Sequence, residues 1–350
     1  MYEKTFWRVI AVGMLLVLIA LFALALYLRW EQPPETAAVF SSDRADAPVR
    51  SEPEPKPIAA QALASGRKHG VYTLLLAGRD DGSGNTDTVL LARLDTYARS
   101  LDIVSLPRDT LVNLDWQVRK LNAVYAGTAN SGGTASEGLR REIRKLCGFS
   151  PDCYAVVDLG VFVEAVDLIG GIDFDLPQDM DYDDEAQDLH IHLKAGPRRL
   201  SGAEAMGLVR YRSGYLNGDL DRVSVQQQFM EAALDQLLSF GSVPRLPELV
   251  NLLAARTDTD LSSANFAWLI RQTLRCERED VRFHTLPNTP AEVAGLSYTL
   301  VEPEAWLAML NDSLSPYALP LRLENLDLVY RDAGGFHATS GALRGGGYYE

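Results

Sequence analysis

Two aspartates and one arginine form the first set of residues whose types could do chemistry. Asp80 and Asp87 flank a polar, glycine-rich loop, and Arg108 follows a proline further along the chain. Carboxylate oxygens bind hard divalent cations, and a guanidinium binds phosphate through paired hydrogen bonds. Together the three residues would suit a divalent cation and a phosphate group. A solvated loop with surface charges explains the same residues, because polar glycine-rich loops are common.

Three short apolar runs must bring these residues together. Residues 71–77, 88–94 and 101–106 are predicted to be strands, ended by a glycine, a polar turn and a proline respectively. If each strand pairs with the next as a hairpin, the first loop and the end of the third strand meet at one edge of the sheet. The pattern therefore predicts that both aspartates and the arginine are neighbours in space.

A second set of cations lies in the later part of the chain. Arg210, Arg212 and Arg222 fall within thirteen residues, and Gln226 shares a helical face with the last of them. Clustered guanidinium groups in an acidic protein could bind a diphosphate. Surface salt bridges with nearby aspartates explain them equally well, since charged residues on helices are usually solvated. A capping box, Ser-Gly-Ala-Glu at 201–204, is predicted to begin the helix before these arginines.

The overall composition excludes several classes of protein. The chain has 350 residues, of which 47% are hydrophobic, and its 33 Lys and Arg against 47 Asp and Glu give a net charge of −14. That charge opposes binding to nucleic acid, which needs a basic face. The chain holds three cysteines. Cys147 and Cys153 flank a short turn that a disulfide could close, and this pairing stays open because sequence does not give their spacing.

The N-terminal part predicts a membrane anchor and a linker. Residues 9–28 carry no charge and are long enough to cross a bilayer as a helix. A cleaved signal peptide is the alternative, although its apolar stretch is usually shorter. Lysine and arginine before the span place residues 1–8 in the cytoplasm and the rest of the chain outside the cell membrane. Residues 29–69, rich in Pro, Ala and acidic residues, are expected to form an extended stalk that lifts the next domain off the membrane.

The remaining chain is expected to hold one domain and a tail. Residues 70–312 carry the apolar periodicity of a folded body, and residues 313–350 end in a glycine-rich stretch expected to be a tail with a disordered end. Residues 173–188 are rich in aspartate but lack the glycine and glutamate that a calcium loop needs. His190 and His192 follow on one side of a strand without a third ligand. We interpret this region as a solvated acidic hairpin.

Several motifs, in a fixed order, resemble one protein family. The sequence is similar to the LytR–CpsA–Psr family of cell-envelope proteins over about residues 70 to 312, behind the predicted anchor. No single motif is specific, but the collinear set is. The motifs are Leu75-Leu-Ala-Gly-Arg-Asp80, Thr86-Asp-Thr88, Ser105-Leu-Pro-Arg-Asp-Thr110, Lys120-Leu-Asn-Ala-Val-Tyr-Ala126, Val166-Asp-Leu-Ile-Gly-Gly-Ile172, Leu200-Ser-Gly-Ala-Glu-Ala205, Val209-Arg-Tyr-Arg212 and Gly218-Asp-Leu-Asp-Arg222 with Gln226-Gln-Gln228.

The resemblance implies a fold and an activity. The fold would be a three-layer α/β/α arrangement around a central mixed sheet. The protein would be a phosphotransferase that moves a glycopolymer from a polyprenyl-pyrophosphate carrier onto an acceptor such as peptidoglycan, with Mg²⁺ or Mn²⁺ as its metal ion. The implied metal ligands are Asp80 and Asp87. The implied pyrophosphate-binding residues are Arg108, Asp109, Lys120, Arg210, Arg212, Arg222 and Gln226, with Asp109 orienting an arginine. Residues 154–159 and 162–169 are candidates to line a groove for the lipid, or to be ordinary core.

Two departures from the family pattern keep alternatives open. Asn85 and Val225 stand where the family usually or often has arginine, so two positive groups are missing. A protein that binds the lipid-linked precursor without reacting is one alternative, and a pyrophosphatase that uses water as acceptor is another. A transcription regulator, a label that the family has carried, is opposed by the predicted anchor and the acidic charge.

Overall fold

A six-stranded mixed sheet lies at the centre of the protein. The computed structural model describes residues 31–36, 66–80, 83–185, 189–211, 225, 228–233, 235–236, 245–346 and 349. The strand order is β10-β3-β2-β1-β4-β9, with β1–β2, β2–β3 and β4–β9 antiparallel and β1–β4 and β3–β10 parallel. The strands are β1 (Val71–Arg79), β2 (Thr86–Asp95), β3 (Ser100–Ser105), β4 (Cys153–Asp158), β9 (Asp258–Thr259) and β10 (Val281–Thr285). Both predicted hairpins are confirmed.

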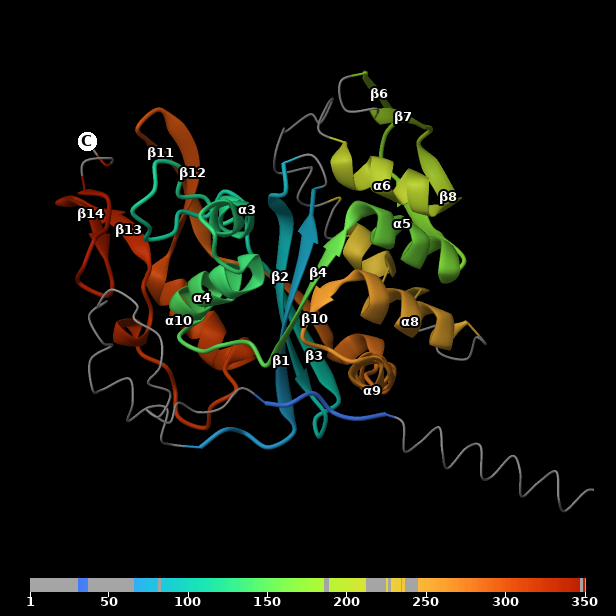
Figure 1. The fold of residues 1–350 in the computed structure, drawn as a ribbon, viewed down its shortest axis with the longest axis horizontal. Coiled ribbons are helices and arrows are strands. Elements are labelled where there is room, and N and C mark those ends of the chain that lie inside the picture. The colour runs from blue at the N-terminus through green and yellow to red at the C-terminus, as the bar shows by residue number, and fades with distance from the viewer. Residues whose placement is uncertain are drawn as a thin grey trace, which may run out of the picture.

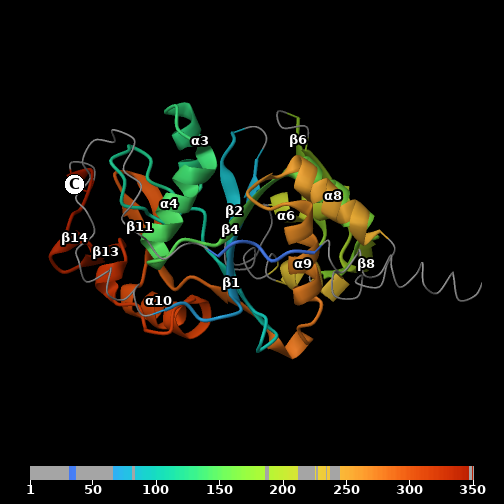
Figure 2. The same cartoon turned by 60° about the horizontal axis from the view of Figure 1, so that its bottom comes forward.

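Helices cover both faces of this sheet (Figures 1 and 2). On one side lie α3 (Ala123–Asn130), α4 (Ala135–Cys147) and α10 (Pro303–Met309), and on the other α5 (Leu159–Leu168), α6 (Gly202–Arg210), α8 (Leu246–Arg256) and α9 (Ser263–Thr273). The apolar face of α4 packs Leu139, Ile143 and Leu146 into the core, as their spacing predicts. The protein therefore has the expected mixed α/β fold, with helices on both faces of a central sheet.

The two faces of the central strands are buried to different degrees. Successive side chains in a strand point to opposite faces. Leu75 and Leu91 are fully buried on the face under α4, whereas Leu76 and Leu90, on the opposite face, are only half-buried. Central strands are usually covered on both faces. Ala92 and Leu94 on this opposite face are buried in the core under α9, so only its end toward Leu76 and Leu90 is half-buried.

The acidic hairpin is confirmed. β6 (Met180–Asp184) and β7 (Leu189–Leu193) pair antiparallel as a hairpin. The strands on either side of this hairpin in the chain, β5 (Ile172–Leu176) and β8 (Gly196–Leu200), also pair antiparallel. His190 and His192 bond Asp183 and Asp181 at 2.6 Å, at the exposed surface. Each histidine thus pairs with a carboxylate across the hairpin. Across the described ranges, no three His, Cys, Asp or Glu side chains converge as a metal site.

The three cysteines are free and buried. Cys147 belongs to the core under α4, while Cys153 belongs to the core under α9. The turn between them carries the chain from one face of the sheet to the other, so the open question of a disulfide is answered: the structure has none between these two. Burial raises the pKa of the Cys276 thiol to about 11.

The segment after residue 312, expected to be a tail, folds onto the domain instead. Its apolar residues Leu314, Tyr317, Leu321, Leu326 and Leu328 are part of the main core. Their burial is the physical reason that the segment stays on the domain. The ring of Tyr349 stacks on the Arg119 guanidinium at 4.0 Å, and residues 347, 348 and 350 lie outside the described part. The segment and its surroundings contain β11 (Asn288–Val293), β12 (Leu296–Val301), η2 (Leu310–Leu314), η3 (Leu323–Asn325), β13 (Val329–Asp332) and β14 (Gly335–Ala338).

The predicted membrane span at residues 9–28 lies outside the described residues. Among the helices that the structure does describe, none has the length and apolar character needed to cross a bilayer. The anchor therefore stays a prediction from the sequence.

The close approach of α5 and α6 yields a stability prediction. Gly202 begins α6, and a Cβ atom there would overlap the backbone carbonyl group of Val163. Because a backbone atom cannot move aside cheaply, Gly202→Ala should destabilise the fold by about 1–3 kcal/mol. Chemical denaturation measures the free energy of unfolding.

A matched control lies in the same helix. A Cβ atom at Gly207 would meet Ile191 at 3.5 Å, an ordinary contact. Because alanine also forms helices better than glycine, Gly207→Ala should be neutral or stabilising by up to about 1 kcal/mol. Equal losses in both variants would contradict the packing argument.

Candidate functional site

The loop between β1 and β2 positions Asp80 through its own hydrogen bonds. The Asp80 N–H donates to the Asn85 carbonyl at 2.9 Å, and the Gly84 N–H donates to the Asp80 carbonyl at 2.9 Å. The Ser83 N–H and hydroxyl donate to Asp80 Oδ2 at 2.9 and 3.0 Å. Gly84 has φ +70°, a conformation that favours glycine. These bonds hold the carboxyl group of Asp80 beside the end of β1.

Asp87 and Arg108 lie next to each other, as the hairpin argument predicts. Leu90 of β2 pairs with Ser105 of β3, so the start of β2, which contains Asp87, lies beside the residues that follow β3. Arg108 Nη1 is 3.4 Å from Asp87 Oδ1. Both side chains are partly exposed, Arg108 to 26% and Asp87 to 40%, so a ligand can reach them.

Asp109 joins Arg108 to Lys120. Lys120 Nζ lies 2.9 Å from Asp109 Oδ1, and Arg108 Nε lies 3.7 Å from Asp109 Oδ2. The Lys120 ammonium also lies 5.6 Å from the centre of the Tyr298 ring, which is fully buried. The Asp109 carboxylate contacts one cation with each of its oxygens. These two contacts restrict the rotamers of the Arg108 and Lys120 side chains. Asp109 is therefore placed to orient both cations.

The backbone of Asn122 connects the two halves of this site. Its N–H donates to the Arg108 carbonyl at 3.0 Å, and its carbonyl accepts from the Thr86 N–H at 3.0 Å. One residue earlier, the Leu121 N–H donates to the Thr110 carbonyl at 2.9 Å. The segment before α3 thus holds the loop after β3 against the start of β2. Sequence reasoning missed this role, because a backbone contact leaves no mark on residue type.

The second set of cations is described only in part. Arg210 lies at the C-terminal end of α6 and is partly exposed. The capping box predicted for this helix is present, with the Ser201 hydroxyl and the Glu204 carboxylate each bonding the other's backbone. Arg212, Arg222 and Gln226 lie outside the described residues. The structure therefore brings together Asp87, Arg108, Asp109 and Lys120, with Asp80 on the adjoining loop.

The donor set at this edge fits a magnesium ion. Magnesium in proteins is held by one or two carboxylates together with waters and substrate phosphate oxygens, rather than by an all-protein cage. Asp80 and Asp87 supply two hard oxygen donors on one loop and the adjoining strand. Manganese accepts the same ligands.

Two tyrosines, of which Tyr125 is buried and Tyr154 half-buried, have a structural role. The Tyr125 and Tyr154 hydroxyls donate to the two carboxylate oxygens of Asp258 at 2.7 and 3.0 Å. Burial, and then the bond to Asp258, raise the pKa of Tyr125 well above its usual value. Tyr125 therefore stays protonated at neutral pH and is no candidate for a general base. The network ties α3 to β4 and β9.

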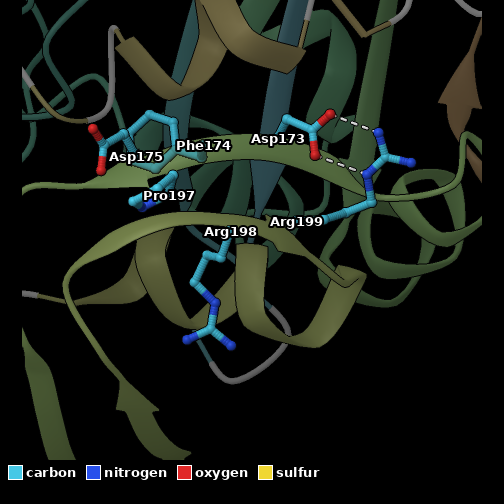
Figure 3. A pocket seen from close by; sticks show the side chains of 6 residues that line it. All are labelled: Asp173, Phe174, Asp175, Pro197, Arg198 and Arg199. Atoms are coloured by element: carbon cyan, nitrogen blue, oxygen red, sulfur yellow. Dashed lines mark hydrogen bonds and ion pairs between the residues drawn. The ribbon is translucent and has the colours of Figure 1, made fainter.

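A shallow depression lies apart from the predicted site residues. Its volume is about 470 Å³. The residues that line it lie in the paired strands β5 and β8 (Figure 3). Arg199 forms a bidentate pair with Asp173 at 2.8 and 2.6 Å, and Arg198 pairs with Glu204. Both arginines of the depression are thus paired with carboxylates, as Arg108 and Lys120 are at the predicted site.

The family can now be stated from comparison with known proteins. The LytR_cpsA_psr family model matches residues 38–313. The chain belongs to the LytR_cpsA_psr family. The match begins before the 70–312 domain expected from the motifs and ends one residue after it.

Curated relatives of this family member come from several bacteria. Regulatory protein MsrR of Staphylococcus aureus is 28% identical over 228 residues, which cover 63% of this chain and 66% of the relative. Cell wall biosynthesis protein LcpA of Corynebacterium glutamicum is 29% identical over 247 residues, covering 63% and 46%. The teichoic acid transferase TagV of Bacillus subtilis, whose full name is polyisoprenyl-teichoic acid–peptidoglycan teichoic acid transferase, is 26% identical over 200 residues, covering 54% and 50%. The chain thus spans about half to two thirds of the lengths of these relatives.

Solved structures share the fold of this family member. B. subtilis TagV superposes with a TM-score of 0.57 at 21% identity, covering 71% of this chain and 98% of that one. A LytR-Csp2A-Psr enzyme from Actinomyces oris gives 0.57 at 22% identity, covering 70% and 90%. TagT bound to LI-WTA gives 0.56 at 17% identity, covering 72% and 92%.

The Asn122 backbone contacts yield a prediction for this site. Asn122 has φ −62°, which proline can adopt, but proline has no N–H to donate to Arg108. Asn122→Pro should therefore cost about 1–3 kcal/mol of unfolding free energy, because the Arg108 carbonyl loses its partner. Asn122→Ala keeps the backbone bonds and should stay within about 0.5 kcal/mol of the parent. Denaturant unfolding of both variants measures the difference, and a larger loss from alanine would show that the side chain is what matters.

Proposed function

We propose that the protein is a membrane-anchored phosphotransferase that moves a glycopolymer from a polyprenyl-pyrophosphate carrier to a cell-wall acceptor such as peptidoglycan. The observation that carries this proposal is the contact of Asp87 with Arg108 at an exposed sheet edge. Family membership and relatives named for teichoic acid transfer and cell wall biosynthesis support it. The product would be a phosphodiester link.

In the proposed reaction, one oxygen–phosphorus bond forms and another breaks. The acceptor hydroxyl oxygen attacks the phosphorus that carries the glycan, and the bond from this phosphorus to the bridging oxygen breaks. Polyprenyl phosphate leaves, and the hydroxyl proton passes to solvent. Such a reaction needs neutralised charge and aligned groups more than a protein nucleophile.

Each site residue has a proposed role in this reaction. Asp80 and Asp87 would hold Mg²⁺ or Mn²⁺, which supplies charge neutralisation at the phosphates. Asp109 would orient Arg108 and Lys120, as its two contacts in the structure suggest. The proposed pyrophosphate-binding residues are Arg108, Lys120, Arg210, Arg212, Arg222 and Gln226.

The half-buried residues on the sheet face opposite α4 support the proposal that the donor carries a lipid. Leu76 lies three residues before Arg79, the last residue of β1, and its partner Leu90 lies three residues after Asp87. Ile103 and Val157 on the neighbouring strands are half-buried too. We propose that the apolar tail of the carrier follows this face. β4 thus contributes through Val157, within the 154–159 segment expected to line such a groove.

The predicted anchor gives the proposed location. Residues 9–28 would cross the cell membrane once, with the N-terminus inside and the catalytic domain outside, where peptidoglycan lies. A transferase joining a membrane-borne donor to a wall acceptor needs this arrangement.

Transfer by the full-length chain in vesicles tests the proposal. The vesicles would contain a short polyprenyl-diphosphate glycan, and peptidoglycan fragments and Mg²⁺ would be added outside. Mass spectrometry should detect phosphodiester-linked product and released polyprenyl phosphate. Arg108→Ala and Asp87→Ala should each lower the rate at least about a hundredfold, because transition-state charge loses a fixed partner. Asp115→Ala, an exposed change in the same region, is the matched control and should leave the rate unchanged.

Other outcomes separate the alternatives. Release of polyprenyl phosphate without linked product would indicate a pyrophosphatase. Tight binding of the donor with no release would indicate a non-catalytic binder. Equal activity of the Arg108→Ala variant would overturn the assignment of this site.

The two departures from the family pattern differ in their surroundings. Asn85 is partly exposed on the loop beside Asp80, whereas Val225 is 6% exposed in an apolar cluster with Phe174 and Phe229. Asn85→Arg should therefore fold normally and raise the transfer rate several-fold by adding a phosphate contact. Val225→Arg should destabilise the fold by about 3 kcal/mol or more, because it buries an unpaired charge. Thermal unfolding and the transfer assay check the two variants, and a stable Val225→Arg protein would contradict the burial argument.

A further inference from the structure

A short segment near the N-terminus is docked on α9. The Gln32 N–H donates to the Ala264 carbonyl at 3.2 Å. The Asn265 amide group donates to the carbonyl oxygens of Gln32 and Pro33 at 2.9 and 3.0 Å. Arg271 Nε lies 2.8 Å from the Glu31 carboxylate, whose side chain is only 6% exposed. Four contacts from three side chains and the backbone hold this segment in place.

The docking position lies at the end of the sheet opposite the candidate site. The Trp268 ring of α9 packs on Tyr72, near the start of β1, with ring centres 4.8 Å apart. The site lies beyond Arg79, where β1 ends, and seven residues of strand span roughly 23 Å. In Figure 1 the blue segment 31–36 crosses beside α9 at the lower end of the sheet, and the β1–β2 loop lies at the upper end.

The Pro-rich segment that follows starts and ends on the domain. After residue 36 the chain returns at Gly66, whose carbonyl accepts from the Ala318 N–H at 3.2 Å. The Lys68 N–H donates to the Pro316 carbonyl at 2.7 Å, and Arg67 pairs with the fully buried carboxylate of Asp152. Residues 37–65 therefore connect two points on the same body. Within the stalk expected for residues 29–69, the described residues at 31–33 and 66–68 thus contact the domain.

The predicted span ends very close to the docked segment. Only two residues separate position 28 from Glu31, and three peptide steps reach at most about 10 Å. We propose that the face of the domain bearing α9 rests on the surface of the lipid bilayer, with the Asp87–Arg108 edge directed away from it. The proposal rests on the membrane anchor of the proposed function. It adds the orientation of the domain and the height of its site, roughly 20 Å or more above the lipid headgroups.

The covalent tether, rather than charge, sets this orientation. Arg275 and Arg278 near the end of α9 are accompanied by Glu277, Glu279 and Asp280, so the surface has no excess of positive charge. A basic patch would make the contact depend on anionic lipid and on salt. We therefore expect the orientation to be the same on neutral and anionic vesicles.

Energy transfer to the membrane surface tests the proposal on the full-length chain. The chain is reconstituted in vesicles of phosphatidylethanolamine and phosphatidylglycerol that contain headgroup-labelled acceptor lipid. A donor dye is placed at Glu279→Cys near α9, or at Ala129→Cys on α3 near the site. Both positions are exposed, whereas the native cysteines are buried. Transfer from position 279 should be at least about twofold that from position 129, because the positions lie toward opposite ends of the sheet.

Asn265→Asp is the variant that breaks the docking. It keeps the side-chain oxygen that accepts from Ser262 at the start of α9 and replaces the amide that donates to Gln32 and Pro33. The helix cap therefore survives, and the two carbonyl oxygens face a carboxylate instead of a donor. The ratio of transfer from the two positions should fall toward one, with Ser263→Ala as the matched control. Deletion of residues 41–60 should leave the ratio unchanged, whereas a stalk would move both dyes toward the membrane.

The outcomes distinguish this proposal from the function on which it rests. Equal transfer from the two positions in a chain that floats with the vesicles would overturn the orientation and leave the anchor intact. A chain that is washed from the vesicles by alkaline carbonate would overturn the anchor and the orientation together. Glycopolymer transfer, measured on the same vesicles, reports separately on the proposed reaction.

Discussion

The candidate site depends on two hydrogen bonds of the Asn122 backbone. Its N–H donates to the Arg108 carbonyl, and its carbonyl accepts from the Thr86 N–H. The carboxylate of Asp87 comes from the start of β2, whereas the guanidinium of Arg108 comes from the turn after β3. Pairing of β2 with β3 ends at Leu90 and Ser105, before either residue is reached. Without a further contact, Asp87 and Arg108 would diverge beyond the sheet. Two backbone bonds at 3.0 Å close that gap, and they do not depend on a side-chain rotamer.

The segment that makes this contact is itself held by distant parts of the chain. Arg119, just before Lys120, is 1% exposed, and its guanidinium stacks on Tyr349. The Asn113 side chain bonds Asp327 and the Ala342 carbonyl at 2.7 and 2.8 Å. The part of the chain beyond the family match thus packs behind the site. The positions of the charged atoms at the site consequently depend on packing against residues 327–349 as well as on the local strands.

Local patterns account for what could be predicted from the sequence. The first three strands follow from short apolar runs closed by glycine, a polar turn and proline, and the start of α6 follows from its capping box. The proximity of Asp87 to Arg108 follows from the hairpin pairing of β2 with β3 alone. In contrast, the partner of β3 on its other side is β10, about 180 residues away, and no local signal marks that pairing. Composition also misled at both ends of the body. Proline-rich and glycine-rich stretches resemble linkers, yet side-chain contacts hold residues 31–33 on α9, and apolar residues between 314 and 328 are part of the main core.

The charges of the site explain why a divalent cation belongs in the proposed reaction. Arg108 and Lys120 are already paired with Asp87 and Asp109, and Asp80 adds another carboxylate close by. A diphosphate that binds these cations competes with the carboxylates for them, and any carboxylate that it displaces stays beside it. The displaced carboxylates would then face the anionic diphosphate, and repulsion at such distances costs several kcal/mol at an intermediate dielectric constant. Asp80 and Asp87 would hold the proposed divalent cation, whose positive charge would offset this repulsion and leave Arg108 to the substrate. The same residues that hold the site together without substrate would thus exchange partners when substrate binds.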